Sequence, residues 1–248
     1  IFNILTRFRV HPVAVTADIE KAFLNIAISL EHRDYLRFLW INDPSCEAPH
    51  IQVLRFTRVV FGLTSSPFIL NATLKHLANQ YANVDPDFVN EVMRSLYVDD
   101  FASGSRDLES ALQLSTKVKT RLSDGGFNMR KWTSNSQEVM EELRKNPTFS
   151  KSEPLIKIDN SIATTSSRVT HGDQPIPITN PRVLGQIWNT STDQLKIELT
   201  KILDHVKHHN VTKRIILSTT AKFYDPLGLI SPIVLMFKLL FNNYASRT

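Results

Sequence analysis

The chain has 248 residues, 42% of them hydrophobic, which is enough to bury a core in one large domain or two smaller ones. Its formal net charge of +5 produces an electric field that attracts polyanions. The single cysteine, Cys46, excludes an internal disulfide framework and is typical of a reducing, intracellular compartment. We interpret it as a loop residue rather than a catalytic thiol. No run of about 18 apolar residues is present, so we expect no membrane-spanning helix.

Apolar periodicity and turn residues divide the chain into predicted elements. In chain order these are a strand at 12–19, a short helical turn, strands at 33–40 and 51–60, a helix within 61–82, two strands within 89–105, a helix at 106–127, a hairpin at 182–197 and a helical tail. This order lacks the regular strand–helix alternation of a parallel sheet. It predicts an α+β fold, in which helices back an antiparallel sheet.

Several local signals mark the ends and turns of these elements. Asp18 lies near the end of the first predicted strand. Ser66 followed by Pro67 is the pattern of a helix N-cap and first turn. The aspartate pair at 99–100 is predicted to form a tight turn between two strands, and the glycine pair at 125–126 to end a helix.

Residues 146–181 differ from the rest in being rich in Pro, Ser, Thr and Asn, with few large apolar residues. We expect a loop-rich connector there, with one short strand at 155–158. The chain begins with Ile1 rather than Met, and its first residues lack the layout of a signal peptide. We therefore expect a piece of a longer protein.

Three aspartates form the strongest candidate site. Adjacent strands of one antiparallel sheet would bring Asp18 close to Asp99 and Asp100, and three converging carboxylates repel each other unless cations lie between them. Mg²⁺ prefers such oxygen ligands, and two ions about 3.5–4 Å apart suit an in-line phosphoryl displacement. Two structural alternatives stay open: the pair at 99–100 as an ordinary polar turn, and Asp18 as a helix N-cap.

The order of three motifs resembles the palm of reverse transcriptases: "ADIEKAF" (17–23), "FGLTSSPF" (61–68) and "YVDD" (97–100). Three later segments resemble LTR retrotransposons of the BEL/Pao type, whose reverse transcriptase belongs to a Pol polyprotein: "GGFNMRKW" (125–132), "VLGQIW" (183–188) and "AKFYDPLGLISPI" (221–233). The resemblance covers nearly the whole chain.

The resemblance implies a role for each matching residue. The implied roles are catalytic metal ligands at Asp18, Asp99 and Asp100; a proton donor to pyrophosphate at Lys131; substrate contacts at Ile19, Phe23, Phe61, Gly62, Tyr97 and Val98; and a primer grip at Leu184 and Gly185. The implied cofactor is a pair of Mg²⁺ ions, with Mn²⁺ as an alternative. Phe23 would be the ring that disfavours a ribose 2′-OH, although its spacing also suits a core aromatic. Lys131 could equally be a solvated charge.

The resemblance also implies an architecture. Residues 1–145 would form the palm with a remnant of the fingers, 146–181 a connector, 182–197 the primer-grip hairpin and 198–248 the start of a helical thumb. Cations of the thumb would face duplex phosphates, and a metal site at the histidines of residues 205–209 is a weaker alternative. The basic fingers are largely missing, and no RNase H, protease or integrase segment is visible.

The implied function is an RNA-directed DNA polymerase, which adds deoxynucleotides to a primer 3′-OH on an RNA or DNA template. The implied partners are the primer–template, dNTPs and the other Pol segments, without a membrane, and the implied location is a cytoplasmic retroelement particle. The main alternative is a non-enzymatic nucleic-acid-binding remnant of a decayed or co-opted retroelement. Another palm polymerase, such as a group II intron maturase or an RNA-dependent RNA polymerase, is a second alternative.

Overall fold

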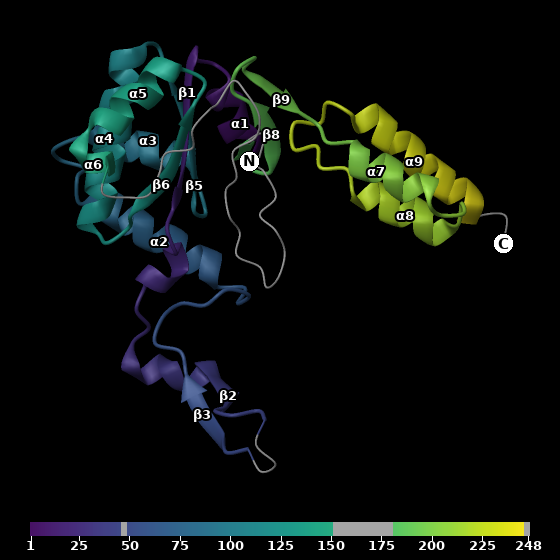
Figure 1. Ribbon diagram of the computed structural model, residues 1–248, viewed down its shortest axis with the longest axis horizontal. Coiled ribbons are helices and arrows are strands. Elements are labelled where there is room, and N and C mark those ends of the chain that lie inside the picture. Colours follow the sequence, from purple (N-terminus) through teal and green to yellow (C-terminus); the bar gives the residue numbers. More distant parts are fainter. Residues whose placement is uncertain (46–48, 151–180, 246–248) are drawn as a thin grey trace. The chain divides into compact units, whose positions relative to one another are not determined.

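The computed structural model describes residues 1–45, 49–150 and 181–245 (Figure 1). The strand expected at 155–158 and Cys46 lie outside these residues. The chain forms two compact units. One comprises residues 1–16, 102–112 and 131–248, and the other comprises 17–101 and 113–130. None of the helices within the described ranges is both long and apolar enough to cross a membrane.

A four-stranded sheet has the strand order β4-β5-β1-β6. Its strands are β1 (Val13–Ile19), β4 (Leu96–Tyr97), β5 (Asp100–Ser105) and β6 (Met129–Ser134). Residues 14–17 of β1 are all buried, so this strand does not show the alternating exposure of a surface strand, and Ala14 packs in a cluster with Leu5 and Phe8 of α1 (Phe2–Phe8). The predicted first strand is confirmed, and so is the position of Asp18 near its end.

Helix α3 (Pro86–Ser95) occupies most of the segment that we expected to be a strand. That prediction was wrong because it overlooked the cap, in which Asp85 accepts a hydrogen bond from the Phe88 N–H at 3.0 Å and Pro86 starts the first turn. Phe88 and Val92 are spaced four residues apart and both are buried on one face of the helix. Only the two residues of β4 precede the turn.

Helix α2 (Ser66–Asn79) begins as predicted except at its cap. Ser65, not Ser66, occupies the N-cap position, and its side chain makes no capping hydrogen bond. Ser66 is buried and its hydroxyl donates to the Val60 carbonyl at 2.6 Å. The serine that we predicted as an N-cap therefore fastens the preceding loop to the helix.

A long helix and a glycine pair precede β6. Helix α4 (Leu108–Asp124) is confirmed, and it ends where the Phe127 N–H donates to the Leu122 carbonyl at 2.9 Å. Gly126 has a φ of +80°, and a Cβ at Gly125 would lie 2.3 Å from Leu77 of α2. The first glycine therefore permits close packing, and the second permits the left-handed backbone.

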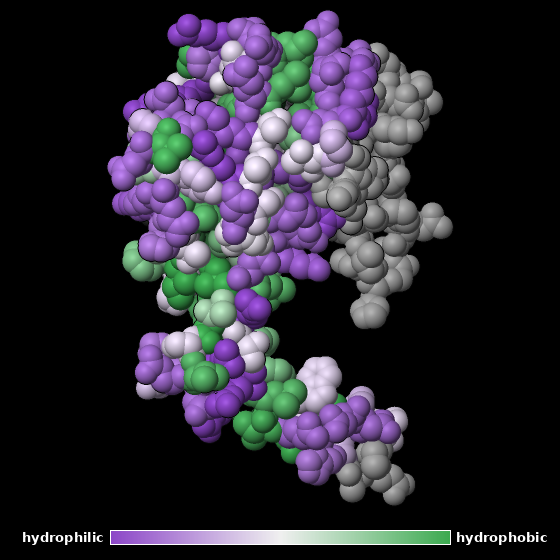
Figure 2. Space-filling model, turned by 90° about the vertical axis from the view of Figure 1, so that its left-hand side faces the viewer, coloured by the Kyte–Doolittle hydropathy of each residue, from purple (hydrophilic) through white to green (hydrophobic). Residues whose placement is uncertain are grey.

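The β2–β3 hairpin pairs β2 (Arg37–Ile41) with β3 (Ile51–Arg55) in antiparallel register. The strands are shorter than expected, because residues 30–36 form the 3₁₀ helix η2 (Leu30–Leu36) and residues 56–60 lie beyond β3. Apolar side chains are exposed along both strands, and hydrophobic patches are visible among polar ones at the lower end of Figure 2.

The other unit contains helix α1 (Phe2–Phe8) and a three-stranded antiparallel sheet, β7-β8-β9. These strands are β7 (Arg182–Val183), β8 (Gln186–Asn189) and β9 (Gln194–Lys196), so the predicted hairpin is present with one further strand. Phe8 and Trp188 form the centre of its core, with an edge-to-face ring contact at 4.9 Å.

Short and long helices complete this unit (Figure 1). Helix α5 (Gln137–Lys145) and α6 (Pro147–Ser150) follow β6, and the helical tail contains α7 (Thr200–Lys207), α8 (Lys213–Ala221) and α9 (Ser231–Ala245). The structure thus confirms a mixed fold of helices and antiparallel sheets. The assignment of its parts to palm, primer grip and thumb stays a prediction.

Candidate active site

The predicted carboxylates lie on backbone segments that are hydrogen-bonded to each other. The Ile19 N–H donates to the Asp99 carbonyl at 2.8 Å, which joins the end of β1 to the β4–β5 turn. Asp18 precedes Ile19, and Asp100 follows Asp99, and all three aspartates are half-buried. One end of the sheet therefore carries three acidic residues from two sequence-distant segments.

The β4–β5 turn separates the two neighbouring aspartates. Tyr97 pairs with Asp100, so the two-residue loop consists of Val98 and Asp99, while Asp100 is the first residue of β5. Val98 has a φ of +57°, a region that β-branched residues strongly disfavour. Strained backbone of this kind is concentrated at functional sites in proteins.

The aspartate side chains do not form a completed metal centre. Among the described residues, no group of three or more Asp, Glu, His or Cys side chains is placed to hold a metal ion. The chemistry of the donors nevertheless suits a hard cation, because carboxylate oxygens are the ligands that Mg²⁺ prefers. The assignment of Asp18, Asp99 and Asp100 as metal ligands thus stays a prediction.

Sequence reasoning missed a polar network beside Asp18, centred on Glu20. The Glu20 N–H donates to the Asn128 carbonyl at 2.9 Å, and the Asn128 side-chain amide donates to the Glu20 carboxylate at 3.0 Å. Arg130 forms an ion pair with the same carboxylate. The hydrogen bond from Asn128, followed by the charge of Arg130, holds the pKa of Glu20 below its usual value, although burial acts in the opposite direction.

Lys119 of α4 extends this network into the core. Its side chain is buried, and its ammonium donates to the Met129 carbonyl at 2.9 Å and to the Asn128 side-chain oxygen at 3.3 Å. Burial, and then the nearby charge of Arg130, lower the pKa of Lys119. The motif at 125–132 is therefore tied directly to the acidic segment at 17–23. The only sequence signal for this tie was that both motifs belong to one resemblance.

Two predicted substrate residues contact each other. Phe23, in the 3₁₀ helix η1 (Ala22–Asn25), packs edge to face with Phe61 at 4.8 Å between ring centroids. Phe23 is 6% exposed and Phe61 is 67% exposed, so the pair joins a core ring to a surface ring. Gly62 follows with a φ of +88° and open space around it, and Ile19 is buried. The positions of these residues do not test their predicted contacts with substrate, which stay predictions.

Lys131 and the Leu184–Gly185 turn belong to the other compact unit. Lys131 is exposed and has a φ of +53°. Leu184 and Gly185 both have positive φ, as in the type I′ turns that join antiparallel strands. Leu184 is buried and Gly185 is exposed, and their roles likewise stay predictions.

The histidines of α7 and the following loop form a ring contact rather than a recognisable metal site. The His205 and His209 rings lie 4.6 Å apart, and His205 shares a hydrogen bond with the Ser218 hydroxyl at 2.9 Å. Burial is the main cause that lowers the pKa of His205. In the parts of the chain that the structure describes, these rings belong to no cluster able to hold a metal.

Two known families match the chain. The family described as reverse transcriptase (RNA-dependent DNA polymerase) matches residues 4–135, slightly more than half of the chain, and includes all three aspartates. The family described as Pao retrotransposon-like RNaseH-like domain matches residues 212–248. The expectation that the chain contains no RNase H segment was therefore wrong for these last residues. No curated protein matches the chain.

The first match agrees with the resemblance of the earlier motifs to reverse transcriptases. The second match agrees with the resemblance of the late motifs to Pao elements. The chain therefore belongs to the reverse transcriptase family, in a form related to Pao retrotransposons.

Proposed function

We propose that the protein is an RNA-directed DNA polymerase of a BEL/Pao-type LTR retrotransposon, which acts within a Pol polyprotein in cytoplasmic particles. It would join a primer 3′-OH to the α-phosphorus of a deoxynucleotide on an RNA or DNA template. One observation supports this most strongly. The hydrogen bond from Ile19 to the Asp99 carbonyl holds three acidic residues at one end of the sheet, inside the region of the family match.

Asp18, Asp99 and Asp100 would hold two divalent cations, Mg²⁺ or Mn²⁺. Three neighbouring carboxylates repel each other unless cations lie between them, and bound cations would remove this repulsion. When bound, the ions would supply the positive charge that an in-line phosphoryl transfer requires. The contribution of the protein is to fix the two backbone segments, and the Glu20 network holds the end of β1 in place for this task.

Residues around this end of the sheet would position the nucleotide and primer. The exposed ring of Phe61 and the open backbone at Gly62 would contact the nucleotide, and the buried ring of Phe23 packs edge to face against Phe61. We propose that Phe23 restricts the space for a 2′-OH. Tyr97 is 42% exposed beside the strained Val98, and both could approach the primer end. Lys131 would donate a proton to the leaving pyrophosphate.

A primer-extension assay tests the proposal, with the chain expressed in its natural reading frame and supplied with an RNA template, dNTPs and Mg²⁺. We expect Asp99→Asn to reduce the rate by orders of magnitude, because the amide removes the charge that would hold the ions. The matched control is Asp87→Asn, an identical change at an exposed position of α3, which should retain the wild-type rate.

Thermal unfolding of both variants establishes that they are folded. A wild-type rate for a folded Asp99→Asn variant would refute the assigned site. A wild-type chain that binds primer–template duplex but shows no extension would instead favour the nucleic-acid-binding remnant.

A further inference from the structure

The turn at Leu184–Gly185 has an unfavourable backbone conformation, and the short strand before it provides little stabilisation. Leu184 has a φ of +47°, where its Cβ crowds the backbone, and Gly185 has a φ of +86°. The preceding strand β7 contributes only Arg182 and Val183 to the ladder. Contacts from outside these two strands must therefore stabilise the turn.

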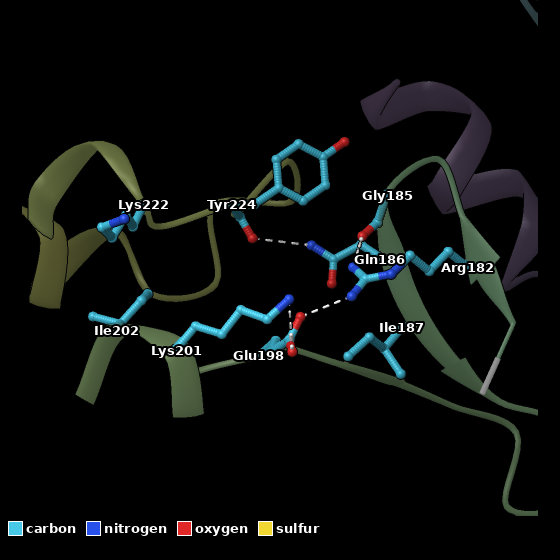
Figure 3. A pocket seen from close by; sticks show the side chains of 9 residues that line it. All are labelled: Arg182, Gly185, Gln186, Ile187, Glu198, Lys201, Ile202, Lys222 and Tyr224. Atoms are coloured by element: carbon cyan, nitrogen blue, oxygen red, sulfur yellow. Dashed lines mark hydrogen bonds and ion pairs between the residues drawn. The ribbon is translucent and has the colours of Figure 1, made fainter. Parts of the chain in front are cut away.

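Tyr224 contacts each of the three residues from Leu184 to Gln186, and Figure 3 shows it beside Gly185 and Gln186. Its hydroxyl donates to the Leu184 carbonyl at 2.5 Å, and its own carbonyl accepts from the Gln186 side-chain amide at 3.1 Å. Its ring lies against Gly185, where an added Cβ would come within 2.8 Å of the ring carbon Cε1. Tyr224 thus contacts the turn through two hydrogen bonds and through the packing of its ring against Gly185.

A second contact set holds the other carbonyl of the turn. Arg182 donates to the Gly185 carbonyl at 3.0 Å and forms an ion pair with Glu198 at 2.8 Å. Glu198 also lies 3.6 Å from the Lys201 ammonium. These side chains, with Tyr224, line a pocket of about 200 Å³ (Figure 3). Both carbonyls of the turn are therefore held, one by a neutral hydroxyl and one by a paired guanidinium.

We propose that Tyr224 is a positioning residue that keeps the Leu184–Gly185 turn in the left-handed conformation needed to receive the primer end. This inference rests on the proposed function, in which that turn is the primer grip. Tyr224 lies in the segment that connects α8 to α9, so it couples the conformation of that segment to the turn. No contact of Tyr224 with nucleic acid is required for this role.

The decisive variant is Tyr224→Phe, which keeps the ring against Gly185 and removes only the hydrogen bond to Leu184. Tyr35→Phe is the matched control, because Tyr35 is 83% exposed and far along the chain in η2. Hydrogen exchange of a peptide covering residues 183–188 reports the stability of the turn without any need for activity. Steady-state primer extension reports KM for primer–template and for dNTP separately.

We expect Tyr224→Phe to speed exchange in that peptide and to raise KM for primer–template by about twofold to tenfold, the factor for one neutral hydrogen bond. KM for dNTP should stay near wild type, and the unfolding midpoint should fall by only a few degrees because one hydrogen bond is lost. Tyr35→Phe should change none of these quantities. A merely structural tyrosine would lower the unfolding midpoint without separating the two KM values.

Wild-type exchange in Tyr224→Phe would overturn the inference, whatever the catalytic result. Faster exchange with an unchanged KM for primer–template would also overturn it, because the turn would then be loosened without consequence for the primer. If the wild-type chain extends no primer, the proposed function fails together with the primer role. Gly185→Ala offers a second route, since its Cβ would displace the Tyr224 ring and should raise the same KM.

Discussion

Val98 lies in the turn between Tyr97 and Asp100 with a φ of +57°, and substitution there measures the strain stored in the candidate site. An L-residue in the left-handed region costs about 1–2 kcal/mol relative to its ordinary conformations. Glycine has no such cost, but it loses about 0.5–1 kcal/mol relative to alanine through the entropy of the unfolded chain. The two effects oppose each other at Val98 and only the second acts at an ordinary position.

The comparison therefore uses alanine and glycine at two sites. Val53 in β3 is the control, because it is 63% exposed and has no positive φ. There, glycine should be less stable than alanine by about 0.5–1 kcal/mol. At Val98 alanine keeps the cost of the left-handed backbone conformation and glycine does not. The difference in free energy of unfolding between the alanine and glycine variants should therefore shift in favour of glycine by about 1–2 kcal/mol relative to Val53.

Urea denaturation of the four variants, monitored by tryptophan fluorescence, measures the difference in free energy of unfolding between alanine and glycine at each site. Equal differences at Val98 and Val53 would refute the reasoning, because Val98 would then carry no conformational strain. We also expect Val98→Gly to extend primers more slowly than wild type without a matching loss of stability, since a more flexible turn positions Asp99 less well.

Two further predictions concern stability. Gly125→Ala should lower the free energy of unfolding by about 1–3 kcal/mol, because the added methyl group overpacks against Leu77. In a Leu77→Ala background this loss should disappear, which a double-mutant cycle measured by urea denaturation would detect. Strictly additive effects of the two substitutions would contradict the prediction. Asp85 accepts from Phe88 and pairs with Lys117 and Arg121, and the hydrogen bond from Lys117 is the main cause that holds its pKa well below its usual value. The contribution of the Asp85 carboxylate to the free energy of unfolding should therefore be complete above the unfolded pKa of about 3.9 and decline as pH falls below it. Asp85→Asn keeps the cap but not the charge, so the difference in free energy of unfolding between wild type and this variant should narrow from pH 7 to pH 3. A difference that stays constant across that range would contradict this prediction.

Local sequence patterns correctly predicted the elements in which buried residues recur at the spacing of one type of secondary structure. The helix at α4 and its glycine stop were clear because apolar residues recur at helical spacing before two residues without side chains. The strand expected over residues 89–95 failed because its apolar residues also suit a helix, and only the cap at Asp85–Pro86 distinguishes the two. The burial of β1 on both faces could not be predicted, because it depends on the elements that pack on the sheet.

The candidate site was predictable in its acidic residues and not in its support. Asp18 and Asp99 are far apart in sequence, yet each lies at the end of a recognisable element, so a shared sheet end was a reasonable expectation that the Ile19 hydrogen bond bears out. Glu20 and Asn128 carry no such signal, since a long-range pair of polar residues has no period. The strain at Val98 was also hidden, because valine is a common strand residue.

The network from Glu20 through Asn128 to Lys119 has a consequence for protein engineering. A chimera that receives the acidic motif of another polymerase without the matching strand of residues 125–132 would leave the Asn128 amide and the Arg130 guanidinium without the Glu20 carboxylate, and Asn128 is also a partner of the buried Lys119. The two motifs thus form one exchangeable cassette, although more than a hundred residues separate Glu20 from Asn128 in the chain. Recombination between related elements is expected to preserve activity when both crossovers fall outside this pair.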